Sequence, residues 1–353
     1  MSVYALKYRT RVCEPQRGHD GSIRFFLATC SVSEENQIHL VEYNDNDEDV
    51  MCVNVYPHSS EVVALAASPS DASLLLTSFN VVRGANVKNQ VALWRLAGDE
   101  SSPKLELVSE LPSSPQTVSS ILWEQGFADT VFTVETGRLL GWNVANLSAA
   151  AALEVVLSSD DVLAPCGGAA LNPHIPTVLG VCVGDSVLGF DTRDAAKQPV
   201  WRLKGPADQL VRDCDFNANK PYFLCSGGDD GKLRFWDYRK PNEPVQQNFP
   251  ASANHSHFIT SVEYNPHHDS LVLSSGTDGL VNLYCAQSVS SSPGSGADYL
   301  VSSYNGFSQS AYRAAWASSD AWTFAAISWD GKAMLACVPD KEKMSILTDN
   351  NQM

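Results

Sequence analysis

Short runs of alternating or continuous apolar residues, each ending at Pro, Asn, Asp or Gly, follow one another along the chain. From His257 the order is "HFITSVEYNP", a polar turn at "HHD", the run "LVLSSG", a turn at "TDG" and the run "LVNLYCA". Alternation with a period of two residues between turn formers is typical of β-strands. No segment keeps a 3.6-residue period, so the pattern predicts an all-β protein.

These runs recur at a regular spacing. Successive strands of one type are 46 to 53 residues apart and are centred on Val41, Trp94, Trp142, Phe190, Trp236, Tyr284 and Ala336. Each interval has room for four short strands, which is the content of one β-propeller blade. We therefore expect residues 1–353 to form a single seven-bladed β-propeller domain.

Seven units in succession leave the last sheet one strand short. The segment "VYALKYR", residues 3–9, alternates and precedes the first complete unit. We assign it as the outer strand of blade seven, so that the N-terminal strand closes the ring. Residues 286–297 are rich in Ser and Gly and are expected to form a flexible loop, and residues 340–353 a short C-terminal tail.

The stretch "SGGDDGKLRFWDYRK" ends a strand with a Trp-Asp pair. Its order of Ser, Asp and Trp, with a His preceding in other units, resembles the WD-repeat propellers; kelch repeats have a similar period and are the weaker alternative. In WD repeats these four side chains form a hydrogen-bonded tetrad, since buried polar groups need partners. The resemblance implies that the Trp-Asp pair is structural.

The tetrad is incomplete in most units. Ala207 stands where a His is expected in blade five, and Tyr284 and Ala336 replace Trp in blades six and seven. In blade two the hydroxyl comes from Thr77 or Ser78. The structural tetrad positions that we assign are His58, Trp94, Ser226, Asp230, Trp236, His255, Ser274 and Asp278.

Composition excludes several classes of function. The net charge of −16 and pI near 4.8 repel nucleic-acid phosphates, and we identify no Lys/Arg cluster, so no nucleic-acid partner is expected. The nine cysteines lack C-x-x-C spacing and indicate buried apolar residues in a reducing compartment. The sequence shows neither a signal peptide nor an apolar run of about 18 residues, so we expect a cytoplasmic protein without membrane insertion.

No motif indicates catalysis, a cofactor or a metal. Asp45, Asp47 and Asp49 have calcium-loop spacing, but Val50 and Tyr56 stand where such a loop needs Gly and Glu. The pairs His255/His257 and His267/His268 lack a third ligand at useful spacing. "GSG" at 294–296 and "GDSVLG" at 184–189 lack the strand-to-helix context of nucleotide and nucleophile motifs. We expect no small-molecule substrate and no clustered carboxylates in the channel.

A closer resemblance spans nearly the whole chain. "SIRFFLATCSVSEENQIHLVEYNDNDED", "QLVRDCDFNANKPYFLCSGGDDGKLRFWDYRKPNEPV", "HSHFITSVEYNPHHDSLVLSSGTDG" and "AISWDGKAMLACVP" are similar to the EARP and GARP complex-interacting protein family, also called the tumour-suppressing subtransferable candidate WD protein. The resemblance implies a non-enzymatic adaptor that binds the EARP and GARP vesicle-tethering complexes. It further implies roles in endosomal recycling, endosome-to-Golgi retrograde transport and dense-core vesicle cargo sorting, with peripheral localisation at the trans-Golgi network and recycling endosomes.

Two Arg motifs support a rival function. "WDYR", with Trp236, Asp237 and Arg239, fits a W-D-x-R box, and "FDTR", with Arg193, nearly fits it. Such boxes dock the ligase adaptor in substrate receptors of cullin-RING ubiquitin ligases, where the planar Arg fork suits the contact. The alternative is that each Arg pairs with its own Asp. A propeller enzyme is a third hypothesis, motivated only by the versatility of the fold.

The partner-binding surface is predicted from geometry. Residues that enter the first strand of each blade ring one end of the channel of a WD propeller. In blades five to seven these are Leu210, Arg212, Phe258, Thr260 and Tyr312. Arg and aromatic residues with apolar neighbours resemble interface hot spots. Alternatively, Leu210 and Phe258 pack between blades, a distinction that periodicity alone does not make.

Overall fold

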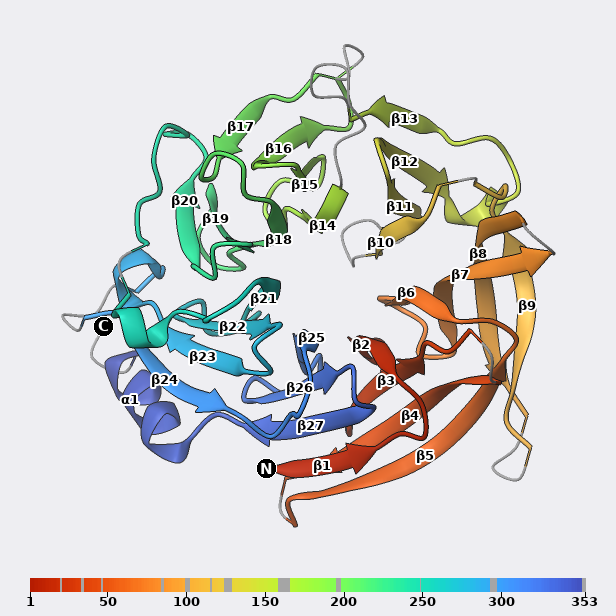
Figure 1. Cartoon of the computed structure of the whole chain (residues 1–353), viewed down its shortest axis with the longest axis horizontal. Coiled ribbons are helices and arrows are strands. Elements are labelled where there is room, and N and C mark those ends of the chain that lie inside the picture. Colours follow the sequence, from red (N-terminus) through yellow and green to blue (C-terminus); the bar gives the residue numbers. More distant parts are fainter. Residues whose placement is uncertain are drawn as a thin grey trace.

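The computed structural model describes residues 1–19, 21–32, 35–45, 47–83, 86–98, 102–114, 116–123, 129–157, 166–194, 198–247, 249–292 and 297–350. Over these residues the strands form seven antiparallel sheets that are arranged as blades around a central axis (Figure 1). The prediction of a seven-bladed WD-repeat β-propeller is confirmed.

The strands follow the chain from the axis outward in each blade. Blade one contains β2 (Thr10–Pro15), β3 (Ile23–Thr29), β4 (Asn36–Asn44) and β5 (Asp49–His58). Blade two contains β6 (Val62–Ala67), β7 (Leu74–Arg83), β8 (Asn86–Ala97) and β9 (Lys104–Glu110). Blade three contains β10 (Val118–Leu122), β11 (Thr130–Glu135), β12 (Arg138–Asn143) and β13 (Leu153–Val156). Blade four contains β14 (Cys166–Leu171), β15 (Val178–Val183), β16 (Ser186–Asp191) and β17 (Trp201–Lys204).

The remaining three blades complete the ring. Blade five contains β18 (Val211–Phe216), β19 (Phe223–Gly228) and β20 (Arg234–Asp237). Blade six contains β21 (Ile259–Tyr264), β22 (Leu271–Gly276), β23 (Val281–Cys285) and β24 (Tyr299–Tyr304). Blade seven contains β25 (Ala311–Trp316), β26 (Thr323–Ser328), β27 (Lys332–Cys337) and, from the other end of the chain, β1 (Ser2–Ala5).

The hydrophobic core lies between blades rather than within any one of them. Every residue of the second strands β15, β19, β22 and β26 is buried, because each sheet is covered on both faces. One apolar cluster joins Leu271 and Leu283 of blade six to Phe324 of blade seven. Another joins Val134 of blade three to Leu179 of blade four. Each blade therefore depends on its neighbours for burial of its apolar faces.

The N-terminal strand closes the ring. β1 pairs antiparallel with β27, with Ser2 opposite Leu335 and Ala5 opposite Lys332. The strand is shorter than the predicted segment, since residues 6–9 lie outside it and Thr10 already begins β2. Tyr4 packs against the cluster shared by blades seven and one, and its hydroxyl is 2.9 Å from Nδ1 of His39. The first and last strands thus share one sheet.

Blade five departs from the expected four strands. Among the described residues its outer strand is reduced to a single bridge between Phe235 and Gln246. The segment that follows β20 is "KPNEPVQQNFP", with prolines at 241, 244 and 250. Proline has no backbone N–H and restricts its neighbours, so it prevents a regular ladder. The sequence contained this signal, but the repeat pattern outweighed it in our prediction.

The segment predicted as a tail contains a helix. α1 (Asp340–Asn350) follows blade seven, and in Figure 1 it lies beside β24 on the outside of the ring. Its Ile346 is buried in the core of blades six and seven. The carboxylate of Glu342 accepts a hydrogen bond of 2.8 Å from the hydroxyl of Tyr299 in β24. The helix therefore packs onto blade six instead of extending freely.

The predicted flexible loop, residues 286–297, begins with ordered contacts. A 3₁₀ turn (Gln287–Val289) follows β23, and Val289 and Ser290 are buried. The backbone N–H of Ser291 donates to Asp269 at 2.7 Å. Residues 293–296, which include the "GSG" stretch, lie outside the described residues.

Hydroxyl groups accept the indole N–H of three of the tryptophans, Trp94, Trp142 and Trp236. In blade two, Nε1 of Trp94 donates to Oγ1 of Thr77 at 2.8 Å, and Nε2 of His58 lies 3.3 Å from the same hydroxyl. Thr77 rather than Ser78 therefore supplies this position; Ser78 donates to Asn89 instead. These contacts fix the indole at the edge of the blade.

Two further blades show the same indole contact. In blade five Nε1 of Trp236 donates to Oγ of Ser226 at 2.9 Å, while Asp230 forms an ion pair with Arg234. In blade three Trp142 donates to Thr133 at 2.9 Å, a pair absent from our assigned set. The Trp-to-hydroxyl bond thus persists where the rest of the tetrad is replaced.

Blade six keeps the other half of the tetrad. His255 is 2.9 Å from Asp278 through Nδ1 and 2.7 Å from Ser274 through Nε2. Tyr284, which replaces Trp, donates from its hydroxyl to the carbonyl of Ala253 at 2.6 Å. The buried hydroxyl of Tyr284 thus has a hydrogen-bond partner outside the tetrad, as a buried polar group requires.

The closing strand generates a stability prediction. Tyr4→Ala removes a half-buried ring and its hydrogen bond to His39, so we expect the free energy of unfolding to fall by about 2 kcal/mol. Val3→Ala on the same strand changes a side chain that is 51% exposed and should cost less than about 0.5 kcal/mol. Urea unfolding followed by tryptophan fluorescence measures both. Equal effects of the two variants would show that β1 contributes no specific packing.

Candidate functional site

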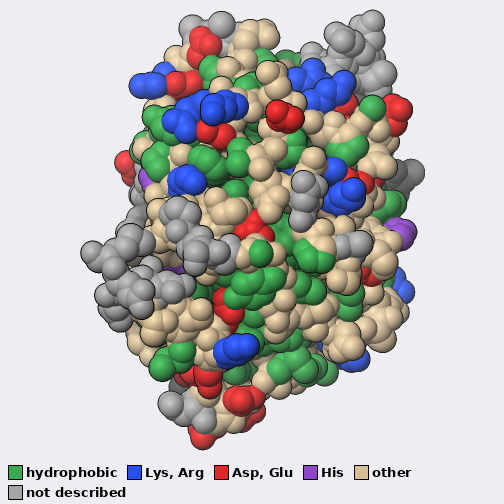
Figure 2. Space-filling model, turned by 90° about the vertical axis from the view of Figure 1, so that its left-hand side faces the viewer, with side chains coloured by type: hydrophobic (Ala, Val, Ile, Leu, Met, Phe, Trp, Pro, Cys, Tyr) green, Lys and Arg blue, Asp and Glu red, His purple; other side chains and the backbone are tan. Residues whose placement is uncertain are grey.

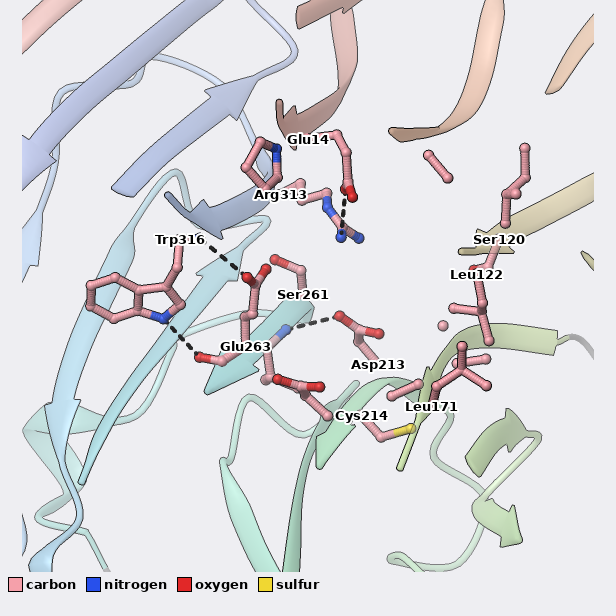
Figure 3. Close-up of a pocket in the computed structure, with 18 of the residues that line it drawn as sticks. Glu14, Ser120, Leu122, Leu171, Asp213, Cys214, Ser261, Glu263, Arg313 and Trp316 are labelled. Atoms are coloured by element: carbon pink, nitrogen blue, oxygen red, sulfur yellow. Dashed lines mark hydrogen bonds and ion pairs between the residues drawn. The ribbon is translucent and has the colours of Figure 1, made fainter. Parts of the chain in front are cut away.

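The first strands of the seven blades surround a central cavity of about 1130 Å³ (Figure 3). Side chains of Glu14, Asp213, Glu263 and Arg313 lie along it, from blades one, five, six and seven. Our expectation that no carboxylates gather in the channel is therefore wrong. Alternation of the first strands carries these polar side chains into the channel, because their apolar neighbours face the blades.

The channel carboxylates cap backbone groups of the neighbouring blade. Asp213 accepts the N–H of Val262 at 3.0 Å, and Glu263 accepts the N–H of Trp316 at 3.2 Å. Asp215 similarly accepts the N–H of Tyr264 at 2.8 Å. The first strand of a blade is a sheet edge, so its outward N–H groups have no ladder partner and need another acceptor. These carboxylates link blade five to six and six to seven.

Arg313 balances the charge of this cluster. Its guanidinium donates to the carbonyl of Cys13 at 3.1 Å and lies 3.4 Å from Glu14, which also pairs with Arg17 at 3.4 Å. Burial raises the pKa of Asp213 to about 6 and that of Glu263 to about 7, while Arg313 opposes both shifts.

The cluster does not resemble a catalytic constellation. Each of its carboxylates holds a backbone N–H or an arginine. Among the described residues, no group of three or more His, Cys, Asp or Glu side chains has the arrangement of a metal site. Raised pKa values often mark active sites, but ion-paired structural networks produce them as well. The geometry assigns the cluster to holding the blades together.

The predicted partner-binding residues lie at one mouth of the channel, which we call the upper face. Each is partly exposed: Leu210, Arg212, Phe258, Thr260 and Tyr312. Arg212 forms an ion pair with Asp229, and its guanidinium lies 4.8 Å from the centre of the Phe258 ring. Thr260 donates to the carbonyl of Ala311 at 2.7 Å and so also ties blade six to blade seven.

Sequence reasoning missed further residues on this face. Trp329 lies 5.4 Å from Tyr312, ring centre to ring centre, and Arg9 lies 5.2 Å from the Trp329 ring. Arg11 lies 5.3 Å from the Tyr312 ring. The signal was the run "LKYRTRV" at 6–12, in which Lys7, Arg9 and Arg11 alternate with other residues.

The two Arg boxes adopt the self-paired arrangement. Arg193 binds Asp191 through Nε and Nη2, at 3.0 and 2.7 Å, and lowers the pKa of that carboxyl to about 2. Arg239 binds Asp237 in the same way, at 2.9 and 2.7 Å, and lies over the Tyr222 ring. The two arginine side chains nevertheless remain 71% and 55% exposed.

Figure 2 shows the rim that carries blades four to six and α1. Lys and Arg side chains gather toward the top of the picture, and hydrophobic side chains lie toward its middle and bottom. The top of this picture is the top edge of the ring in Figure 1 and differs from the upper face defined above. In blade four the exposed Arg202 and Lys204 both face Asp185, at 3.4 and 3.8 Å. The blade-four part of this rim is therefore charge-balanced.

The acidic loop and the paired histidines have other partners. Asp47 accepts from Asn44 at 2.8 Å and Asp49 from the N–H of Val50, while position 46 lies outside the described residues. His257 contacts Thr277, and His268 stacks on Trp322 with ring centres 4.3 Å apart. In the described part of the chain, no helix is both long and apolar enough to cross a bilayer.

Comparisons with known proteins agree with this fold. The family described as the EIPR1 β-propeller matches residues 1–284. The EARP and GARP complex-interacting protein 1 of Rattus norvegicus is 31% identical, with 98% of both chains aligned, and that of Homo sapiens is 30% identical over the same shares. The WD repeat-containing protein DWA2 of Arabidopsis thaliana is 28% identical, with 95% of both chains aligned.

A solved structure of the COPII outer coat vertex on membranes contains a chain with the same fold. It superposes with a TM-score of 0.74 at 15% sequence identity, over 94% of this chain and 84% of that chain. At this identity the likeness concerns the propeller architecture alone.

The channel cluster generates a pH prediction. Between the usual value of 4.5 and the raised value of about 7, the native protein holds a proton on Glu263 that the unfolded chain releases. The contribution of Glu263 to stability therefore falls as pH rises through this window. We expect Glu263→Gln to gain about 2 kcal/mol relative to the parent protein between about pH 5 and pH 8, in urea unfolding.

Asp191→Asn is the control for this measurement. The pKa of Asp191 is lowered to about 2, so its variant should differ from the parent by the same amount throughout that range. A Glu263→Gln difference that is equally flat would mean that the channel does not favour the protonated carboxyl.

Proposed function

Because this chain belongs to the EIPR1 β-propeller family, we propose that it is a non-enzymatic adaptor that binds the EARP and GARP vesicle-tethering complexes. The observation that carries the proposal is the end-to-end alignment with relatives named as interactors of both complexes. A subunit common to the two complexes is the simplest partner, since one surface then serves both.

The chemistry of the propeller supports an adaptor rather than an enzyme. The polar groups of the channel bind backbone and one another, and the Trp-to-hydroxyl contacts satisfy buried donors. What remains available is surface: exposed Arg and aromatic side chains on a rigid closed ring. Preorganised surfaces of this kind bind partners at a reduced ordering cost.

We further propose the cellular role that such binding serves. The adaptor supports endosomal recycling, endosome-to-Golgi retrograde transport and dense-core vesicle cargo sorting. It is cytoplasmic and reaches the trans-Golgi network and recycling endosomes through its partners. The surface that we assign to the tether is the upper face, with Arg212, Phe258 and Tyr312 as its principal contacts.

The ubiquitin-ligase alternative retains one supporting observation, the exposure of both box arginines. Against it, Nε and Nη2 of each arginine already donate to the neighbouring aspartate, Asp191 or Asp237. A docking partner would have to replace two charge-assisted hydrogen bonds for each arginine. The adaptor proposal needs no such exchange.

Affinity capture tests the two functions together. The tagged chain should recover EARP and GARP subunits from cell extract by mass spectrometry. Arg212→Ala with Phe258→Ala should lower the recovery about tenfold, because it removes the cation and the ring that stack on the upper face. Arg193→Ala with Arg239→Ala serves as the matched pair and should leave recovery unchanged.

Two results would contradict the proposal. Failure of the folded parent chain to recover any tether subunit removes the adaptor function. Recovery of a cullin-RING adaptor that is lost in the Arg193→Ala, Arg239→Ala variant, with the fold intact by circular dichroism, establishes the alternative.

A further inference from the structure

The junction of blades seven and one carries two arginines against two aromatic rings on the upper face. We call Arg9, Arg11, Tyr312 and Trp329 the seam patch. The Arg9 guanidinium lies 5.2 Å from the Trp329 ring centre, and that of Arg11 lies 5.3 Å from Tyr312 and 6.0 Å from Trp329. Guanidinium groups at this range over an aromatic face are held by cation–π attraction and keep their outer N–H groups available.

The backbone of the seam patch is fixed. Thr10, between the arginines, is fully buried and donates to the carbonyl of Ser328 at 3.0 Å. The carbonyl of Arg9 accepts the N–H of Cys30 at 2.8 Å. Because side chains alternate along an extended segment, burying Thr10 directs both arginines to the exposed side. The two charges are therefore presented by a rigid segment at the closure of the ring.

Charge balance distinguishes these arginines from four other exposed ones. Arg138, Arg193, Arg202 and Arg239 each pair with a carboxylate. Neither Arg9 nor Arg11 has a carboxylate within 4.0 Å among the described residues. Arg11 interacts with the Cys30 thiol, and the neighbouring Glu61 accepts a hydrogen bond from Asn80 at 2.6 Å. Arg95 is a further exposed arginine without an ion pair among the described residues, so what sets Arg9 and Arg11 apart is that both lie against the Trp329 ring.

The seam patch continues into the surface assigned to the tether. The N–H of Trp329 donates to the carbonyl of Ser310 at 3.0 Å, and the Ser310 hydroxyl donates to the carbonyl of Thr277 at 3.3 Å. The N–H of Thr277 in turn donates to the carbonyl of Phe258 at 2.9 Å. Loops of blades five, six, seven and one thus form one connected surface with an Arg-aromatic pair at each end.

We propose that the seam patch binds an acidic, extended peptide segment of a tether subunit. The proposal rests on the adaptor function proposed above and names the chemistry of its ligand. Side chains two residues apart in an extended strand are about 7 Å apart, which is also the spacing of carboxylates in an Asp/Glu-x-Asp/Glu segment. Each carboxylate can accept a bidentate pair from one arginine, while the intervening side chain lies against Trp329 or Tyr312.

A peptide fits this surface better than an anionic membrane does. Membrane recognition by charge needs a cluster of about four to eight basic residues, and each contributes about 1 kcal/mol. The seam patch offers two uncompensated arginines, and the net charge of −16 repels an anionic bilayer at long range.

Fluorescence anisotropy with two synthetic probes tests the proposal on the full chain. The acidic probe repeats Glu-Ser-Glu-Leu three times, and the matched probe has Gln in place of every Glu. We expect the acidic probe to bind about tenfold more tightly than the Gln probe, with affinity that falls as salt rises. Arg9→Gln with Arg11→Gln should remove this preference, and Arg202→Gln, a control at an exposed but paired arginine, should keep it.

The results separate this inference from the adaptor function. Equal binding of the two probes, or an unchanged preference in Arg9→Gln, Arg11→Gln, overturns the seam patch as an acidic-peptide site, whether or not the tether is captured. Arg-dependent probe binding by a parent chain that captures no tether subunit keeps the site and removes the proposed partner. Arg-dependent binding to phosphatidylserine vesicles, without a preference between the probes, assigns the patch to lipid and also overturns the proposal.

Discussion

The ring depends on acceptors for the backbone N–H groups at the open edge of the innermost strands, as blades five to seven show. In an isolated sheet that edge exposes backbone N–H groups, which is costly when water is restricted. Here Asp213, Asp215 and Glu263 reach across to the next blade and accept those groups. Arg313 then compensates the negative charge that this arrangement accumulates. The acidic channel is thus a consequence of ring assembly, and its raised pKa values need no catalytic explanation.

The sequence was sufficient to predict the architecture because the same strand pattern recurs seven times. An uncertain assignment of one strand is corrected by the equivalent strands in the other repeats. Seven similar strands and the alternating N-terminal segment determined the number of blades and the closing strand. Reliance on the repeat also caused two departures from it to be missed. Three prolines reduce the outer strand of blade five, yet the repeat predicted four strands there. α1 was predicted as a tail because its sequence has no clear amphipathic period. Ile346 is its one deeply buried apolar residue among those described.

The candidate site was harder to predict, for a physical reason. Arg9 and Trp329 are neighbours because the start of blade one packs against blade seven, and no local pattern links residues so far apart in the chain. The residues chosen from blade geometry, such as Arg212 and Phe258, do lie at the channel mouth, since their positions follow from the repeat. The sequence allowed Arg193 either to pair with Asp191 or to remain free for a partner. The folded structure shows that its guanidinium binds Asp191.

Joining the two ends of the polypeptide in one sheet also affects biosynthesis. Ser2 to Ala5 leave the ribosome before blades one to six are made, whereas their partners, Lys332 to Leu335, are translated after those blades. Blades one to six can pair their strands in order as they emerge, but blade seven must wait with an unfilled position. β1 is therefore made before the rest of its sheet but is incorporated last, and a nascent chain stalled before β27 would present an open ring to chaperones.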